Sequence, residues 1–343
     1  MAETAIAAKQ ANSFVSELEA KHLHPLWDRY QRITPIKPSP KDAPFIWRWR
    51  DIEPFLHRSV GEVSINDIER RALIMAHPAF GAETTTTSTL LAAFTVLEPG
   101  DRARPHRHTG AAIRFATRAD GAATIVNGRR CEMNDGDLIL TPPMCWHGHI
   151  NDSDHRIIWF DAANMPLIRA VDAHFFEPGD VSNNEFWQVD EGEERLWTEA
   201  GLRAQGATAG PVNSPKYRYP GEATRRLLAA APRAADGARM IRYVNPTTGG
   251  AVMPTLDCYA ARLGQGTPTR TKRTTYNVIC LVVTGEGRST IGGETFEWSQ
   301  HDVFTIPHWT WARHEAKGGD ADLFIVTDKS AFEALDLVRE EME

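Results

Sequence analysis

Residues 105–115, PHRHTGAAIRF, contain two histidines one residue apart, and HGH at 147–149 repeats that spacing. In a β-strand, residues i and i+2 point to the same face, so His106 and His108 would converge. Neutral imidazoles are good ligands for iron, manganese, zinc or copper. One pair means little by itself, because the chain has 13 histidines. Two histidines from one strand and His147 from a partner strand would form a three-histidine metal site with open positions.

Arg114 and His149 are the other candidates for chemistry in these stretches. If the first strand runs unbroken, residues 106–114 alternate so that Arg114 shares the inward face with both histidines. A buried guanidinium needs an anionic partner, and its planar fork suits the carboxylate of an organic acid. The alternative is an arginine at the mouth of a barrel, paired with a distant aspartate. His149 shares a face with His147 and could move protons near neutral pH, or serve as a fourth ligand or a hydrogen-bonding residue. Asp161 is a candidate partner to orient it.

Composition limits the class of protein. The chain has 343 residues, 42% of them hydrophobic and 24% charged, and a net charge of −7, which argues against general affinity for nucleic acid or anionic membranes. It contains no apolar run of 18 residues and no signal-peptide pattern at its start. The four cysteines have no paired spacing, which predicts reduced thiols. We expect a cytoplasmic protein.

Two β-rich regions must position these residues. Short β-rich runs separated by turns occupy 83–163 and return over 240–328, which predicts two barrels in a mainly all-β fold. Residues 1–82 are expected to hold a helical segment, with a helix over 9–31, and lead-in strands. Residues 164–239 are expected to form a linker with a helix at 222–231, and residues 329–343 a C-terminal helix.

The two β-rich regions align with each other, which indicates an internal duplication. The matched pairs are Gly121 with Gly287, Ile125 with Ile291, Asp137 with Asp302, Pro142 with Pro307, and Trp146 with Trp311. In this alignment Lys272 and Thr274 stand opposite the first two histidines, and Ala312 stands opposite His147. His314, which matches His149, is left alone. We therefore expect the metal in the N-terminal barrel only.

The spacing around the histidines follows the two-part signature of the cupin superfamily, small antiparallel barrels that carry a metal inside. Gly100 lies six residues before His106, and Gly136 and Pro142 lead to His147. Met144 stands where the signature has a glycine. The glutamate that many cupins place after the second histidine is missing, so the site should have three histidines and no carboxylate.

The chain resembles the gentisate 1,2-dioxygenase family, which includes the salicylate, 5-nitrosalicylate and 1-hydroxy-2-naphthoate dioxygenases. The resemblance rests on HRHT…RF, CWHGH and WFDAANMPLI, and on ERRAL at 69–73, KYRYPGEATRRLL at 216–228 and IRYVNPTTGGAVMPT at 241–255. It implies a bicupin, two double-stranded β-helix (jelly-roll) barrels with a few peripheral helices. It also implies a homotetramer.

The resemblance further implies an extradiol-type aromatic ring-cleaving dioxygenase. Fe(II) would be held by His106, His108 and His147, and the substrate would be an aromatic acid whose ring opens between the carboxyl- and hydroxyl-bearing carbons with both atoms of O2. Arg114 and Arg70 resemble the arginines that orient the carboxylate and the ring. His149 resembles the acid–base residue.

Two departures from the family pattern bear on the substrate. Gly110 stands where the family commonly has glutamine, and Leu91-Ala92-Ala93 stands where it commonly has Trp-Ala-Gly. Both remove bulk or hydrogen bonding near the ring, and Gly110 is expected to leave room for a ring substituent. With Asp161 they complete the expected substrate pocket, and they favour a substituted salicylate such as 5-nitrosalicylate.

Three other functions remain open at this point. Gentisate itself could be the substrate. A metal cupin isomerase or decarboxylase that uses manganese or zinc would be favoured by a glutamate ligand, which is lacking. A cupin module that senses an aromatic acid would usually carry a DNA-binding helix-turn-helix, which one N-terminal helix on an acidic chain does not supply.

Overall fold

The structure, a computed structural model, describes residues 13–180, 182, 186 and 212–343, and the chain divides into two compact units, residues 1–39 and 40–343. In the first unit, the helix expected over 9–31 is only partly correct. Residues 13–19 are helical and α2 spans Tyr30–Ile33, but the residues between them are not helical, and residues 9–12 lie outside the described residues. Pro25 has no backbone N–H to donate, and His22 has a left-handed φ of 58°, so the helix cannot continue through them.

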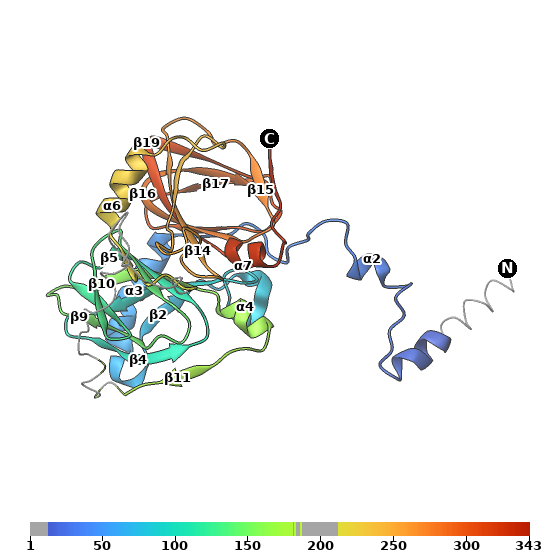
Figure 1. Ribbon diagram of the computed structural model, residues 1–343, viewed down its shortest axis with the longest axis horizontal. Coiled ribbons are helices and arrows are strands. Elements are labelled where there is room, and N and C mark those ends of the chain that lie inside the picture. Colours follow the sequence, from blue (N-terminus) through green and yellow to red (C-terminus); the bar gives the residue numbers. More distant parts are fainter. Residues whose placement is uncertain (1–12, 181, 183–185, 187–211) are drawn as a thin grey trace. The chain divides into compact units, whose positions relative to one another are not determined.

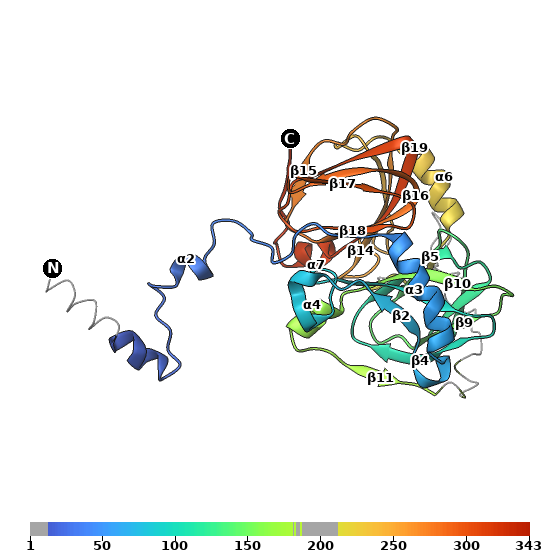
Figure 2. The ribbon, with the colours of Figure 1, turned by 180° about the vertical axis from the view of Figure 1, so that it is seen from behind.

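The second unit contains two β-barrels, which confirms the predicted fold class (Figures 1 and 2). The N-terminal barrel has a six-stranded sheet in the order β12-β8-β5-β10-β3-β2 and a five-stranded sheet in the order β11-β4-β9-β6-β7. Its strands are β2 (Arg71–Ile74), β3 (Leu91–Leu97), β4 (Arg102–His108), β5 (Ala112–Arg118), β6 (Ala122–Val126), β7 (Arg129–Met133), β8 (Leu138–Thr141), β9 (His147–Asn151), β10 (Ile157–Ala163), β11 (Phe176–Pro178) and β12 (Arg218–Tyr219).

The C-terminal barrel is one nine-stranded sheet built around the path β1-β18-β16-β19-β14-β13. Its strands are β1 (Ile46–Trp47), β13 (Arg239–Arg242), β14 (Asp257–Leu263), β15 (Lys272–Thr274), β16 (Val278–Ile291), β17 (Glu294–Trp298), β18 (Val303–Ile306), β19 (Ala312–Thr327) and β20 (Glu340–Met342). The α-helices in the described part of this unit are α3 (Trp49–Glu62), α4 (Met165–Ala170), α6 (Gly221–Ala230) and α7 (Lys329–Ala334), and 3₁₀ turns cover Ile65–Asp67 and Pro78–Glu83. Helix α6 confirms the helix expected at 222–231. None of the helices in the described part of the chain is long and apolar enough to cross a membrane.

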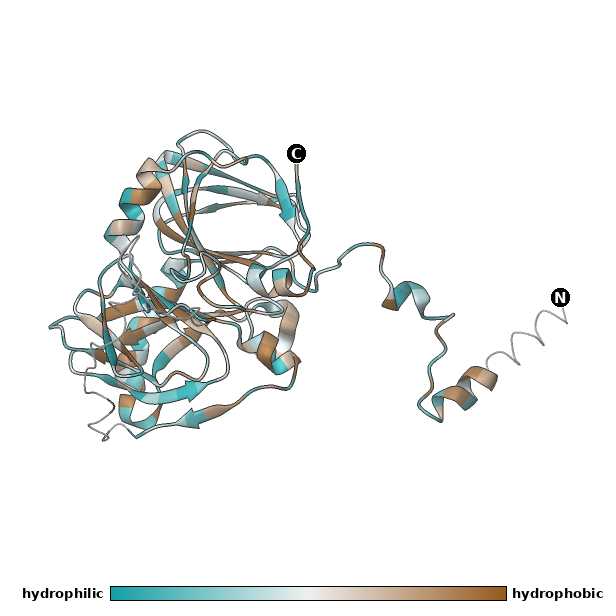
Figure 3. Cartoon of the chain, in the orientation of Figure 1, coloured by the Kyte–Doolittle hydropathy of each residue, from teal (hydrophilic) through white to brown (hydrophobic). Residues whose placement is uncertain are grey.

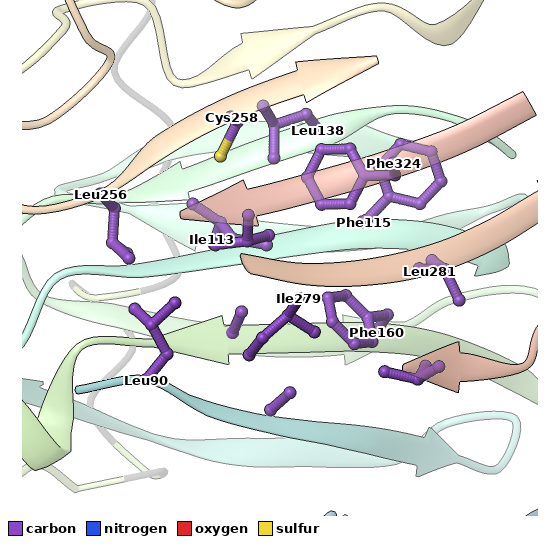
Figure 4. Packing of buried hydrophobic residues seen from close by; sticks show 14 of the residues in the cluster. Leu90, Ile113, Phe115, Leu138, Phe160, Leu256, Cys258, Ile279, Leu281 and Phe324 are labelled. Atoms are coloured by element: carbon purple, nitrogen blue, oxygen red, sulfur yellow. The ribbon is translucent and has the colours of Figure 1, made fainter. Parts of the chain in front are cut away.

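The inner strands of the six-stranded sheet, β3, β5, β8 and β10, are mostly buried on both faces. On β5, Ile113 and Phe115 face the other barrel and join a core that contains Ile279 and Phe324 from β16 and β19 (Figure 4). The alternate residues of β5, with Arg114 between those two, point to the inside of the N-terminal barrel, because side chains alternate along a strand. The contact between the barrels thus fixes which residues line the interior.

The predicted segment boundaries do not coincide with the sheets. β1, in the segment expected to lead into the first barrel, pairs with β18 of the second. β2 pairs with β3, and β11 and β12, from the expected linker, pair with β4 and β8. The predicted C-terminal helix is correct only as α7, because Asp336 takes a left-handed φ of 56° and the chain then forms β20 against β15.

The strand pairing shows how the residues of the two barrels correspond: β6 pairs with β9 in the first barrel, and β16 pairs with β19 in the second. His147 pairs with Val126, and Ala312 pairs with Ile291. Ile291 therefore corresponds to Val126, and the sequence match of Ile291 with Ile125, like that of Gly287 with Gly121, is wrong by one residue. The match of Asp137 with Asp302 agrees with the structure, because each carboxylate accepts a hydrogen bond from the backbone N–H of the residue three positions earlier in the chain.

Candidate active site

Three buried histidines meet inside the N-terminal barrel. His106 and His108 end β4, His147 begins β9, and His106 lies opposite His147 across the two strands. One nitrogen from each ring lies within 4.8 Å of the others. In the described part of the chain, these three histidines are the cluster of His, Cys, Asp or Glu side chains that could hold a metal ion. β4 is mainly hydrophilic in Figure 3, as is its counterpart β15.

Backbone carbonyls fix the orientation of all three imidazoles. Each ring contacts a carbonyl oxygen two residues away through Nδ1, so Nδ1 carries the proton and Nε2 is the free acceptor. The acceptors are the carbonyls of Arg104, Gly110 and Cys145, at 2.9, 2.8 and 2.9 Å from the rings of His106, His108 and His147. Nε2 of His147 is buried without a hydrogen-bond partner. A buried polar atom left unpaired is costly, and a metal ion is the partner that this arrangement fits.

Burial keeps these rings neutral. It lowers the pKa of His106 and of His108 to about 4, and the pKa of His147 well below its usual value, with neighbouring positive groups adding to the effect on each. A neutral imidazole is the form that binds a metal, so the three ligand atoms are available near neutral pH.

Arg114 lies inside the barrel, but the expected unbroken strand is wrong. β4 ends at His108, and after a short turn β5 begins at Ala112 in the other sheet. Arg114 still points inward, because the inner faces of both sheets enclose the same interior. Its side chain is 1% exposed.

A charged network surrounds the Arg114 guanidinium. Nε donates to Nε2 of His149 at 3.1 Å and lies 3.6 Å from Oδ1 of Asp161, while Nη1 donates to Oγ1 of Thr141. Thr95 donates to the other carboxylate oxygen of Asp161. Burial lowers the pKa of Arg114 to about 10, so it stays charged at neutral pH. The distant aspartate considered as an alternative partner is therefore Asp161.

His149 is held as a neutral base. Because Arg114 donates to its Nε2, the ring proton lies on Nδ1, which donates to Oγ1 of Thr124 at 3.0 Å. Burial, followed by the charge of Arg114, lowers the pKa of His149 well below its usual value. Asp161 was expected to orient His149, and this is wrong: the carboxylate contacts Arg114, and Arg114 contacts the imidazole.

Arg70 lies beside the triad together with a residue that the sequence analysis did not single out. Nη1 of Arg70 donates to Oε1 of Glu69 at 2.5 Å, and that oxygen lies 3.2 Å from Nδ1 of His106. Nε of Arg70 is buried without a partner. Burial alone would raise the pKa of Glu69, but the charges of Arg70 and His106 lower that pKa by more, so the net shift is downward and the carboxylate stays ionised. In the sequence, the one feature that pointed to Glu69 is its place next to Arg70 in the ERRAL block at 69–73.

Phe176 of β11 was also missed. Its ring stacks on His106 with 5.4 Å between ring centroids. Only a pair of adjacent phenylalanines in the expected linker marked this position in the sequence. The contact places an exposed aromatic side chain next to a candidate ligand.

Gly110 does not provide open space. A Cβ at this position would lie 2.2 Å from Sδ of Met165 on α4, so the room expected for a ring substituent is already filled by that side chain. Leu91, the first residue of β3, shares the strand face of Thr95, which reaches Asp161 inside the barrel. Leu91 therefore lies on the inner wall.

Met144 occupies a left-handed position with φ of 60°, where the cupin signature has glycine. Its backbone N–H donates to the carbonyl of His108 at 2.8 Å. Trp309 takes the same conformation, with φ of 57°, in the second barrel. The chain therefore keeps this turn without glycine, and the turn ties the β8–β9 connection to a candidate ligand.

Comparisons with known proteins agree with this geometry. Residues 93–162 match the model of the cupin domain family. The chain is 32% identical to gentisate 1,2 dioxygenase 1 of Aquipseudomonas alcaligenes, covering 98% of each protein, and 34% identical to 5-aminosalicylate 1,2-dioxygenase of Comamonas sp, covering 96% of this chain and 91% of that one. It is similar to the crystal structure of salicylate 1,2-dioxygenase from Pseudoaminobacter salicylatoxidans in an adduct with gentisate, with a TM-score of 0.91 and 34% identity over 97% of this chain and 94% of that one.

Proposed function

Because the chain belongs to the gentisate 1,2-dioxygenase family of cupin proteins, we propose that it is an Fe(II)-dependent enzyme that opens the ring of a 2-hydroxybenzoate-type acid. Cleavage between the carboxyl- and hydroxyl-bearing carbons would incorporate both atoms of O2. The observation that carries the proposal is the buried histidine triad, in which Nε2 of His147 has no partner, beside the buried Arg114 and the partly buried Arg70.

His106, His108 and His147 would hold the metal ion. Three imidazoles leave coordination positions open and suit iron among several metals. When bound, Fe(II) supplies positions for substrate oxygens and for O2, together with the redox chemistry that O2 requires. The protein's own contribution is to fix the three rings through their Nδ1 hydrogen bonds.

Arg114 and Arg70 would bind the substrate carboxylate and orient the ring. Arg70 has a buried Nε without a partner, and the Nε atom of Arg114 lies 3.6 Å from Asp161, longer than a good ion-pair hydrogen bond. A substrate carboxylate would offer both guanidiniums a closer acceptor. His149 would accept the proton of the substrate hydroxyl at Nε2, the nitrogen that Arg114 now occupies, so substrate must first draw the guanidinium away.

A substituted salicylate such as 5-nitrosalicylate is our first candidate substrate, supported by the apolar Leu91 on the inner wall. Gentisate is the second candidate, favoured by the names of the relatives, which include enzymes for gentisate, 5-aminosalicylate and salicylate. All these acids carry a carboxyl group beside a hydroxyl group.

Anaerobic loading with Fe(II), followed by oxygen-uptake assays on salicylate, 5-nitrosalicylate, 5-aminosalicylate and gentisate, tests the proposal. We expect uptake of one O2 per ring opened with at least one of these acids. Iron-loaded protein that consumes no oxygen with any of them would contradict the ring-cleaving function. The ratio of kcat/KM values between 5-nitrosalicylate and gentisate decides between the two candidates.

We also propose that the working form is a homotetramer. The first unit, residues 1–39, supports this because several large apolar side chains in it are more than half exposed. These side chains are Phe14, Leu23, Leu26, Trp27, Tyr30, Ile33 and Ile36. Light scattering that finds only a 38 kDa monomer would contradict it.

A further inference from the structure

The C-terminal barrel contains a partly open cavity of about 190 Å³ that has no part in the ring-cleaving site. Ala238, Ala261 and Ala312 leave the space, because they place only methyl groups on the inner wall. Larger apolar side chains, among them Leu263, Val278 and Leu323, line another part of the wall, and polar side chains line the rest. An engineered apolar cavity of about 150 Å³ admits benzene, so this volume suits a single substituted ring.

The register of the two barrels shows how the wall differs from that of the ring-cleaving site. Three polar residues around the candidate substrate carboxylate are replaced by a thiol and two aliphatic side chains. The replacements are Cys280 for Arg114, Ile325 for Asp161 and Ile306 for Thr141. The position equivalent to Arg114 therefore offers no guanidinium to a carboxylate.

One polar feature of the first barrel is retained. His314 replaces His149, and its Nδ1 contacts Oγ of Ser289 at 2.7 Å, as His149 contacts Thr124. The other ring nitrogen, Nε2, has no hydrogen-bond partner in the described part of the chain, and the side chain lines the cavity. An imidazole nitrogen that is open to a cavity and has no protein partner is available to a ligand atom placed beside it.

Lys272 provides a second polar group. It stands opposite Ala312 across β15 and β19, at the place of His106, and lines the cavity. Its Nζ donates one hydrogen bond, to Oδ2 of Asp236 at 2.6 Å, which leaves two N–H groups for another acceptor. Arg273 and Lys329 also line the cavity, and they pair with Glu341 and Glu340. Because each of these positive charges has a carboxylate partner, the cavity favours an uncharged ligand over an anion.

We propose that this cavity is a second small-molecule site that takes an uncharged phenol, with the ring against the apolar wall and the hydroxyl group between His314 and Lys272. The proposal is independent of the ring-cleaving function. It concerns only the C-terminal barrel, so a binding measurement tests it and enzyme turnover does not.

Crystals of the full-length protein soaked in 4-iodophenol test the site directly, because the iodine can be located by its anomalous scattering. We expect iodine inside the C-terminal barrel, with the phenol oxygen within hydrogen-bond distance of His314 or Lys272. Iodine found only in the N-terminal barrel, or nowhere in the protein, would overturn the proposal.

Titration with 4-fluorophenol followed by ¹⁹F NMR gives the affinity of each variant. His314→Phe keeps the ring but removes Nε2, and should weaken binding about five- to tenfold. Ala312→Leu fills the cavity and should abolish this binding. Arg313→Gln, on the exposed face of the same strand, is the matched control and should change nothing.

Metal content and oxygen uptake should be unchanged in all three variants, because none of these residues lies in the N-terminal barrel. Unchanged phenol affinity in folded Ala312→Leu and in His314→Phe would refute the site. If Ala312→Leu does not fold, the soaked crystal and His314→Phe still decide.

Discussion

Replacing Arg114 by methionine should damage both the fold and the binding of substrate, and the two effects can be separated. Arg114 and Asp161 are 1% and 8% exposed, and the carboxylate has Thr95 as its other side-chain partner. Removing one member of a buried ion pair leaves an uncompensated charge and typically costs about 3–5 kcal/mol. We expect the free energy of unfolding of Arg114→Met to fall by about that amount.

A second change removes the stranded charge. In Arg114→Met/Asp161→Asn, the amide oxygen still accepts from Thr95, and no buried charge remains. Replacing both members of a buried pair is often close to neutral, so most of the lost stability should return. Substrate binding should not return, because the group that binds the carboxylate is still absent. Loss of such a charged contact costs about 2–5 kcal/mol, or about 30-fold to several-thousand-fold in kcat/KM.

Three measurements on each variant decide the outcome: urea unfolding, iron content, and oxygen uptake against the best substrate. Arg118→Met on the same strand is the control, since Arg118 pairs with Glu53 at the surface, where an ion pair contributes about 0–1 kcal/mol. Recovery of kcat/KM together with stability in the double variant would refute the reasoning, because Arg114 would then serve only to neutralise Asp161.

Three further predictions concern the metal site, the turn after it and the N-terminal unit. His106→Ala should lose the bound metal and the activity, and stoichiometric iron with full turnover by metal analysis would contradict the triad. Gly110→Ala should lower the free energy of unfolding by about 1–3 kcal/mol, because its Cβ displaces Met165, and Met165→Ala should restore much of that loss; an unchanged urea midpoint for the single variant would show that Met165 moves aside freely. Deleting residues 1–39 should shift the protein to smaller oligomers in light scattering, and an unchanged tetramer would show that the exposed apolar side chains of this unit do not hold the assembly.

The histidine triad could be predicted from the sequence because its geometry is mostly local. A period of two places His106 and His108 on one face of a single strand, and only His147 must come from elsewhere. Arg114 was placed inside the barrel by an argument that fails, since a turn separates its strand from β4. It is inside because the inner faces of both sheets converge on one interior.

Long-range partners could not be predicted in the same way. Asp161 meets Arg114 because β10 pairs with β5, and no local pattern specifies which strands become neighbours. Met165 fills the space beside Gly110 for the same reason. The sequence shows a small residue at position 110, but only the packing of α4 shows what occupies the space.

The difference between the two barrels follows from the cost of buried charge. Both have the same strand register and keep a histidine on a hydroxyl group, yet one interior carries the Arg114–Asp161 pair and the other carries Cys280 and Ile325 at the same places. A lone arginine at position 280 would be buried opposite an isoleucine, which is unfavourable. The two positions must therefore change together.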